Sequence, residues 1–192
     1  MTQKTVQTWR CRVVVALAAF LATAALSTPA SAQDMSKEDA AAVKAAFLAD
    51  IEGVKTKFVQ LGGAFPDDKM AWRPMAGVRS VAEVLALVAS EFNGFVPGGF
   101  GGKPLLPREE MQALAKSTNK ADLIAAINKT FDHTKSQLAG IDPATITGKR
   151  PVMGQPRSAI EASLMIGGDL HEHLGQLIAY ARMNNVVPPW SK

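Results

Sequence analysis

Apolar side chains recur at alternating steps of three and four residues along most of the chain, which is the spacing of one face of an α-helix. The clearest example is a seven-residue series in the first such segment: Ala40, Val43, Phe47, Ile51, Val54, Phe58 and Leu61. No segment after residue 32 shows a convincing alternation of apolar and polar residues, the pattern typical of a half-buried β-strand. The pattern therefore predicts an all-α protein whose helices bury their apolar faces against one another.

Residues that start and end helices bracket four segments of this kind. Ser80 with Glu83, and Ser158 with Glu161, have the spacing of a capping box, in which each side chain bonds the other residue's backbone N–H. Glycine or asparagine follows each segment and can end its helix. We expect helices bounded by these residues: Ser36 and Gly62, Ser80 and Gly94, Thr118 or Asn119 and Gly140, and Ser158 and Asn185. Four amphipathic helices predict a four-helix bundle.

A long segment, residues 95–117, separates the second expected helix from the third. It contains the glycine-rich run 97–104, which has some likeness to a phosphate-binding loop. No predicted strand precedes this run, however, and Pro104 stands where a phosphate-binding loop has Ser or Thr. We interpret the segment as a long crossover loop held against the bundle by Phe95 and Phe100.

The first 32 residues have the pattern of a secretory signal peptide. Basic residues precede an almost wholly apolar run at residues 13–27, and Ala-Ser-Ala at residues 30–32 has the small residues of a cleavage site. The run is shorter than the roughly 20 apolar residues that span a bilayer, which disfavours the alternative of an uncleaved membrane anchor. We therefore predict a periplasmic or secreted protein, cleaved after Ala32, in which residues 33–192 form one domain.

Cleavage changes what charge and cysteine content imply. The removed segment holds Lys4, Arg10 and Arg12 and no acid, so the excess of basic over acidic residues falls from four to one. The basic composition is therefore no evidence for a nucleic-acid partner. Cys11 also leaves with the segment, so the mature chain has no disulfide, thiol nucleophile or cysteine ligand.

Chemistry-bearing residues concentrate on the fourth expected helix, where residues 169–176 read Asp-Leu-His-Glu-His-Leu-Gly-Gln. Asp169 and His173 are four residues apart and share a face, which we expect to border the bundle interior or a cleft in it. His171 and His173 point about 200° apart on a regular helix and cannot bind one ion. Histidine is the commonest protein ligand of transition metals, so this helix is the first candidate site.

A set of short motifs runs through the chain in order: Phe65-Pro66, Trp72-Arg73-Pro74, the stretch 77–86, His173-Leu174-Gly175-Gln176, Tyr180, Arg182 and the stretch 186–189. Together these residues resemble the DinB-like superfamily, which includes metal-dependent thiol transferases. The resemblance spans the chain after the signal peptide. It implies a four-helix bundle with up-down-down-up connectivity and a homodimer as a frequent assembly.

The resemblance also implies a metal site, which this chain alters. Family members with an intact site have three histidines: one lies seven residues after the capping serine of helix two, and two lie in an H-x-x-x-H-x-x-Q pattern on helix four. These positions fall on Leu87, Asp169 and His173, so one histidine of three is retained. Leu87 cannot bind a metal, whereas Asp169 can bind a hard or borderline divalent ion.

Three accounts of this departure stay open. In the first, the site is degenerate and the domain is a small-molecule or protein binding module or a structural module. In the second, Glu91, one turn after Leu87, joins Asp169 and His173 to hold Zn, Ni or Mn in a hydrolase or thiol S-transferase. In the third, His173 acts as a base oriented by Asp169 without a metal. No cofactor, substrate or catalytic residue is certain from the sequence.

The remaining conspicuous side chains favour structural interpretations. His171 and the adjacent pair Asp132 and His133 are expected at the surface. Trp72 is expected to plug one end of the bundle. Arg182 lies in the last turn of helix four, where it complements the helix dipole.

Export gives the first testable prediction. Mass analysis of the exported protein is expected to place Gln33 at its N-terminus, within about two residues, because small residues at 30 and 32 favour cleavage there. An exported protein that retains Met1 would contradict both the cleavage and the predicted localisation.

Overall fold

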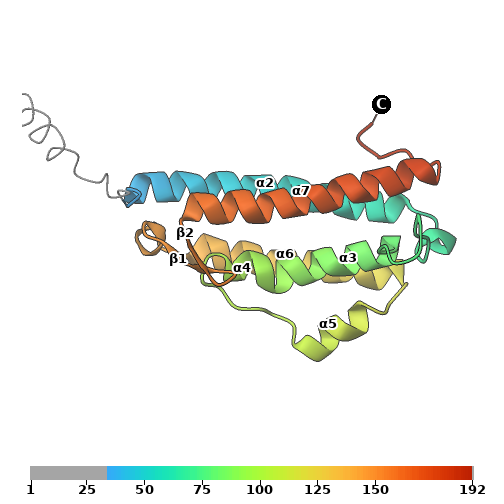
Figure 1. Cartoon of the computed structure of the whole chain (residues 1–192), viewed down its shortest axis with the longest axis horizontal. Helices are drawn as coiled ribbons and strands as arrows, with labels where there is room; N and C mark the ends of the chain where they lie inside the picture. The colour runs from blue at the N-terminus through green and yellow to red at the C-terminus, as the bar shows by residue number, and fades with distance from the viewer. Residues whose placement is uncertain (1–33, 192) are drawn as a thin grey trace, which may run out of the picture. The chain divides into compact units, whose positions relative to one another are not determined.

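The computed structural model describes residues 34–191; the predicted signal peptide and its cleavage site lie outside the described residues. The described elements are, in chain order, α2 (Lys37–Ala64), the 3-10 turn η1 (Asp67–Lys69), α3 (Val81–Ser90), the π-helical segment η2 (Glu91–Phe95), α4 (Val96–Gly98), α5 (Arg108–Leu114), α6 (Lys120–Gly140), the 3-10 turn η3 (Pro143–Ile146), β1 (Arg150–Val152), β2 (Gln155–Arg157) and α7 (Ala159–Met183). The protein is mostly helical, which confirms the predicted all-α class (Figure 1).

Four long helical segments pack around one core. Helix α2 packs along α7 and against α6, and α3 packs along α6 and against α7 (Figure 1). Large side chains from α2, the loop after it, η2 and α6 fill the space between the helices: Phe58, Phe65, Phe92 and Phe131. Burial of these apolar faces drives the packing that the sequence pattern predicted.

The helix starts follow the predicted caps. The Ser36 hydroxyl accepts a hydrogen bond from the backbone N–H of Asp39, and Asn119 caps α6. Ser80 and Ser158 each form a complete capping box. Asn185 adopts a left-handed conformation just after α7, with φ of 58°. These bounds were predictable because capping depends on residues three or four apart.

The predicted end of the second helix at Gly94 is wrong. The chain stays helical through η2 and α4 to Gly98, because buried side chains on both sides of the glycine, Phe92 and Val96, fix this stretch in the core. Pro97 gives a physical reason for the widened π-helical turn, because in a regular α-helix its ring would clash with the carbonyl of Asn93. In the widened turn the Val96 N–H donates to the carbonyl of Glu91, five residues earlier, and the Thr134 hydroxyl donates to the carbonyl of Phe92.

The long connection between α3 and α6 is more ordered than predicted. It contains α5, and the side chain of Asn93 holds the segment before α5 through three hydrogen bonds with the backbone of Leu105 and Leu106. Phe100 is buried and Phe95 is half-buried, so these two aromatics do hold the segment against the bundle.

A short antiparallel hairpin of β1 and β2 corrects the prediction that the chain has no strand. Each strand has three residues, and Pro151 pairs with Pro156. The turn uses Met153 and Gly154, both with positive φ of 52° and 73°. Strands this short are below the length at which alternation can be recognised.

The stretch Val81–Gly98 has a mean hydropathy of 1.2 and is long and apolar enough to cross a membrane. However, 67% of it is buried inside the protein. Its position in the core therefore accounts for its apolar composition.

Loss of the Thr134 hydroxyl tests how the π-helical segment is held. Thr134→Val is expected to lower the free energy of unfolding by about 1–3 kcal/mol, because it leaves the buried carbonyl of Phe92 without a donor. Thr130→Val is the matched control: Thr130 is equally buried on α6, but its hydroxyl bonds carbonyls of its own helix. Urea unfolding should separate the two variants; equal losses would contradict this role of Thr134.

Candidate metal centre

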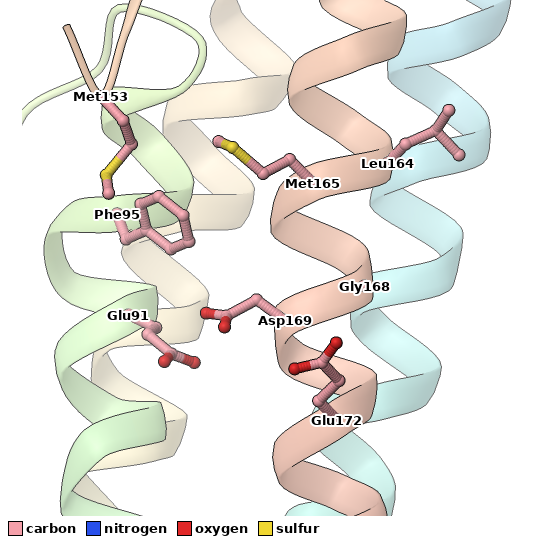
Figure 2. A pocket seen from close by; sticks show the side chains of 8 residues that line it. All are labelled: Glu91, Phe95, Met153, Leu164, Met165, Gly168, Asp169 and Glu172. Atoms are coloured by element: carbon pink, nitrogen blue, oxygen red, sulfur yellow. The ribbon is translucent and has the colours of Figure 1, made fainter.

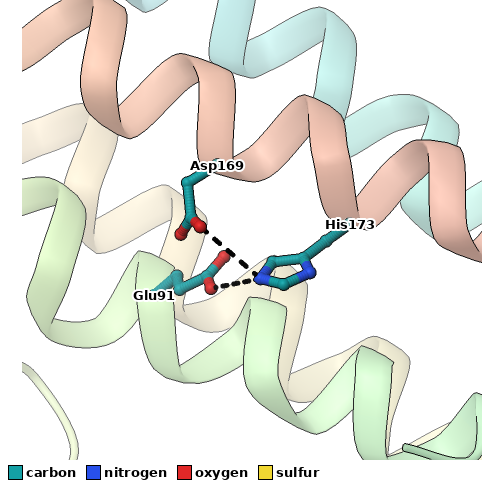
Figure 3. Close-up of side chains that lie close together, drawn as sticks. All are labelled: Glu91, Asp169 and His173. Carbon is teal, nitrogen blue, oxygen red and sulfur yellow. Dashed lines mark ion pairs between the residues drawn. The ribbon is translucent and has the colours of Figure 1, made fainter. Parts of the chain in front are cut away.

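Two helices bring three candidate ligands together. Glu91 is the first residue of the π-helical segment that continues α3, and Asp169 and His173 lie one turn apart on α7. Because α3 packs against α7, the Glu91 side chain points across the contact towards both α7 residues (Figure 3).

The distances place the three side chains within reach of one ion. His173 Nε2 lies 3.1 Å from Glu91 Oε1 and 3.8 Å from Asp169 Oδ1 (Figure 3). One ligand atom from each residue lies within 4.8 Å of the other two. The side chains of Glu91 and His173 are 8% and 16% exposed, whereas that of Asp169 is 38% exposed. Asp169 therefore lies at the solvent side of the group.

Glu91 is the unusual member of the group. Its Oε2 atom is buried and has no hydrogen-bond partner among the described residues. Burial, followed by the negative charge of Asp169, raises the pKa of Glu91 to about 8. A hydrogen bond with the Asp169 side chain also raises this pKa. The raised pKa means that Glu91 favours a proton, or a cation in its place, near neutral pH.

The donor set fits a divalent metal ion. Two ligand atoms on opposite sides of an ion lie up to about 4.4 Å apart when each bond is about 2.2 Å. The three ligand atoms here lie within 4.8 Å of one another, so small side-chain rotations would bring all three into contact with one ion. Two carboxylates and one imidazole suit hard or borderline ions, and three protein ligands leave coordination positions free for another molecule.

The other predicted positions lie elsewhere. Leu87, one turn before Glu91, is half-buried and lines a separate cavity of about 300 Å³ with residues that include Met111 and Ala115. His171 is exposed and pairs with Asp50 of α2 at 3.0 Å, so it points away from His173, as predicted. His133 contacts the carbonyl oxygen of Lys103.

Trp72 and Tyr180 hold the end of α7 against the loop before α3. The two rings meet edge to face with their centroids 5.4 Å apart. The Tyr180 hydroxyl donates to the carbonyl of Arg79 and accepts from Gln176. This contact fixes α7 beside the start of α3, one end of the helix pair that carries the candidate ligands.

The sequence allowed for a cleft beside Asp169 and His173 but did not predict which residues line it. A hollow of about 640 Å³ is bordered by Glu91, Asp169 and further residues of α7 and of the hairpin turn, among them Met153 and Glu172 (Figure 2). No sequence signal marked Met153, because its place depends on the hairpin that was not predicted.

One comparison with known proteins gives the family. A family model described as the DinB superfamily matches residues 50–177, which is more than half of the chain and includes all three candidate ligands. No curated protein matches the chain.

The raised pKa of Glu91 predicts how stability depends on pH. Between about pH 5 and pH 8 the folded, metal-free protein keeps a proton on Glu91 that the unfolded chain, with a pKa near 4.5, releases. The free energy of unfolding is therefore expected to fall as pH rises, by up to about 1.4 kcal/mol per unit, and to level off above pH 8.

Urea unfolding from pH 5 to pH 9 checks this dependence. Glu91→Gln should flatten it, and Glu110→Gln, at an exposed carboxylate on α5, should leave it unchanged. A slope that persists in Glu91→Gln would show that other groups cause it.

Proposed function

The chain belongs to the DinB superfamily, and from that membership we propose that Glu91, Asp169 and His173 bind one divalent metal ion in this protein. The buried, unpartnered Oε2 of Glu91 carries the proposal, because a carboxylate withdrawn from water is costly unless a cation or donor compensates it. Convergence of the three side chains from two helices supports the same role.

We propose further that the site serves a metal-dependent enzyme of the hydrolase or thiol S-transferase type. A divalent ion, when bound, supplies Lewis acidity at such a site. Glu91 and His173 hold their positions inside the protein, and the more exposed Asp169 borders the side from which a substrate can approach. The cavity next to Asp169 supports this direction of approach.

The proposed setting is an exported, homodimeric four-helix bundle with up-down-down-up connectivity. The N-terminal pattern supports export, and the family supports the dimer and the connectivity. In Figure 1 the colours show α2 and α7 running from left to right and α3 and α6 running from right to left, which is consistent with that connectivity.

A metal-free binding or structural module is the second candidate. The 3.1 Å contact between His173 and Glu91 favours it, because an ion pair or hydrogen bond of this length partly compensates the buried carboxylate without a metal. A proton kept on Glu91 next to Asp169 compensates the second oxygen in that case. The metal site is the better supported candidate because three ligand atoms from two helices lie within 4.8 Å of one another.

Metal analysis separates the two candidates. The purified protein is expected to bind one equivalent of Zn, Ni or Mn, and the bound ion should raise the melting temperature because it stabilises the folded state. Glu91→Ala, Asp169→Ala and His173→Ala should each lose the ion. His171→Ala is the matched control on the same helix and should keep it, since His171 faces Asp50.

Affinity should also rise between pH 6 and pH 8, because the ion displaces the proton on Glu91. A protein that binds less than about a tenth of an equivalent, with a melting temperature that added metal does not change, would favour the module.

A further inference from the structure

The cavity beside the three candidate ligands has two chemically different ends. Its lining includes four apolar side chains, those of Phe95, Met153, Leu164 and Met165. In Figure 2, Phe95, Met153 and Met165 lie above Glu91 and Asp169, Leu164 points to the other side of α7, and the carboxylates lie below. A ligand that fills the cavity therefore meets apolar surface at one end and acidic groups at the other.

The acidic end holds three carboxylates, Glu91, Asp169 and Glu172. No Lys, Arg or His is among the described residues that line the cavity, but His173 contacts Glu91 at 3.1 Å from outside the lining. The more exposed Asp169 and Glu172 therefore carry the negative charge that faces the cavity. Arg79, whose charge is felt by Glu91, lines the separate cavity near α5. A negatively charged molecule would therefore be repelled at this end, and a positively charged one attracted.

The environment of Glu91 indicates that the cavity binds a ligand. The Glu91 side chain is more than nine-tenths buried, lines the cavity and has an oxygen without a hydrogen-bond partner. The volume of about 640 Å³ lies within the range of roughly 300–1,000 Å³ that is typical of small-molecule sites. The apolar side chains add burial energy that does not depend on charge.

We propose that the cavity binds the substrate of the metal site, and that this substrate is an amine carrying an apolar body, with the ammonium group between Asp169 and Glu172. That the bound amine is a substrate rests on the proposed function of the metal site. The binding preference itself follows from the lining residues and does not need the metal. The same preference makes thiols that carry several carboxylate groups, such as acidic thiol peptides, poor ligands of this cavity.

Gly168 provides a way to close the cavity without disturbing the ligands. It lines the cavity on α7, and a side chain added there meets no atom within 4 Å. Gly175, also exposed on α7 with no atom within 4 Å, does not line the cavity. Both glycines lie within a helix, where leucine is a better helix former, so Gly168→Leu and Gly175→Leu should both fold.

Three probes with one apolar body test the preference: 3-phenylpropylamine, 3-phenyl-1-propanol and 3-phenylpropionate. Calorimetric titration of the purified protein, metal-free and metal-loaded, is expected to show the amine binding about ten-fold tighter than the alcohol, and the carboxylate weakest. Gly168→Leu should weaken all three probes, and Gly175→Leu none. Glu172→Gln should narrow the gap between amine and alcohol, whereas Glu110→Gln should preserve it.

Metal content separates this inference from the proposed function. Gly168→Leu and Glu172→Gln alter no candidate ligand, so both variants should still bind the ion. If the unaltered protein binds no metal but still prefers the amine, only the proposed function is contradicted. Equal affinity for the three probes, tighter binding of the carboxylate, no binding of any probe at millimolar concentration, or unchanged amine binding in Gly168→Leu would each overturn the amine assignment.

Discussion

The contact of the Glu91 carboxylate with His173 is the constraint on which the site depends. A carboxylate inside a helical bundle is unfavourable unless a donor or cation meets it, and His173 lies 3.1 Å away on α7. This contact requires the junction of α3 and η2 to stay beside the middle of α7. The Trp72–Tyr180 packing and the Tyr180 hydrogen bond to Arg79 hold one end of that pair in place.

The π-helical segment belongs to the same arrangement. Glu91 stands at its first residue, so the widened turn begins where the acidic side chain crosses to α7. Pro97 cannot satisfy the carbonyl of Phe92, and Thr134 from α6 does so instead. A π-helical turn inside an α-helix is often found at functional sites, and here it couples the position of Glu91 to a third helix.

The sequence predicted what depends on residues close together in the chain. Helix starts at Ser36, Ser80, Asn119 and Ser158 follow from capping side chains, and the Asp169/His173 pair follows from a spacing of four. Glu91 was a candidate because it lies one turn after Leu87. What could not be predicted was set by distant contacts. Gly94 stays helical because Phe92 and Val96 are buried, and the cavity exists because the hairpin turn at Met153 lies beside α7.

Leu87 and Asp169 stand where the family pattern has histidines, and Asp169 makes the candidate site more negative. The resemblance implies three neutral imidazoles, which leave a divalent ion with its full charge, whereas Glu91 and Asp169 together with His173 bring it near neutrality when both acids are ionised. An ion so compensated attracts anions weakly, and Glu172 adds a further negative charge beside it. In the proposed site, Glu91 would take the place of the ligand that Leu87 cannot supply, and both Glu91 and Asp169 would add negative charge to the ion. Such a site would favour cationic molecules over the anionic thiols that an uncompensated ion would hold.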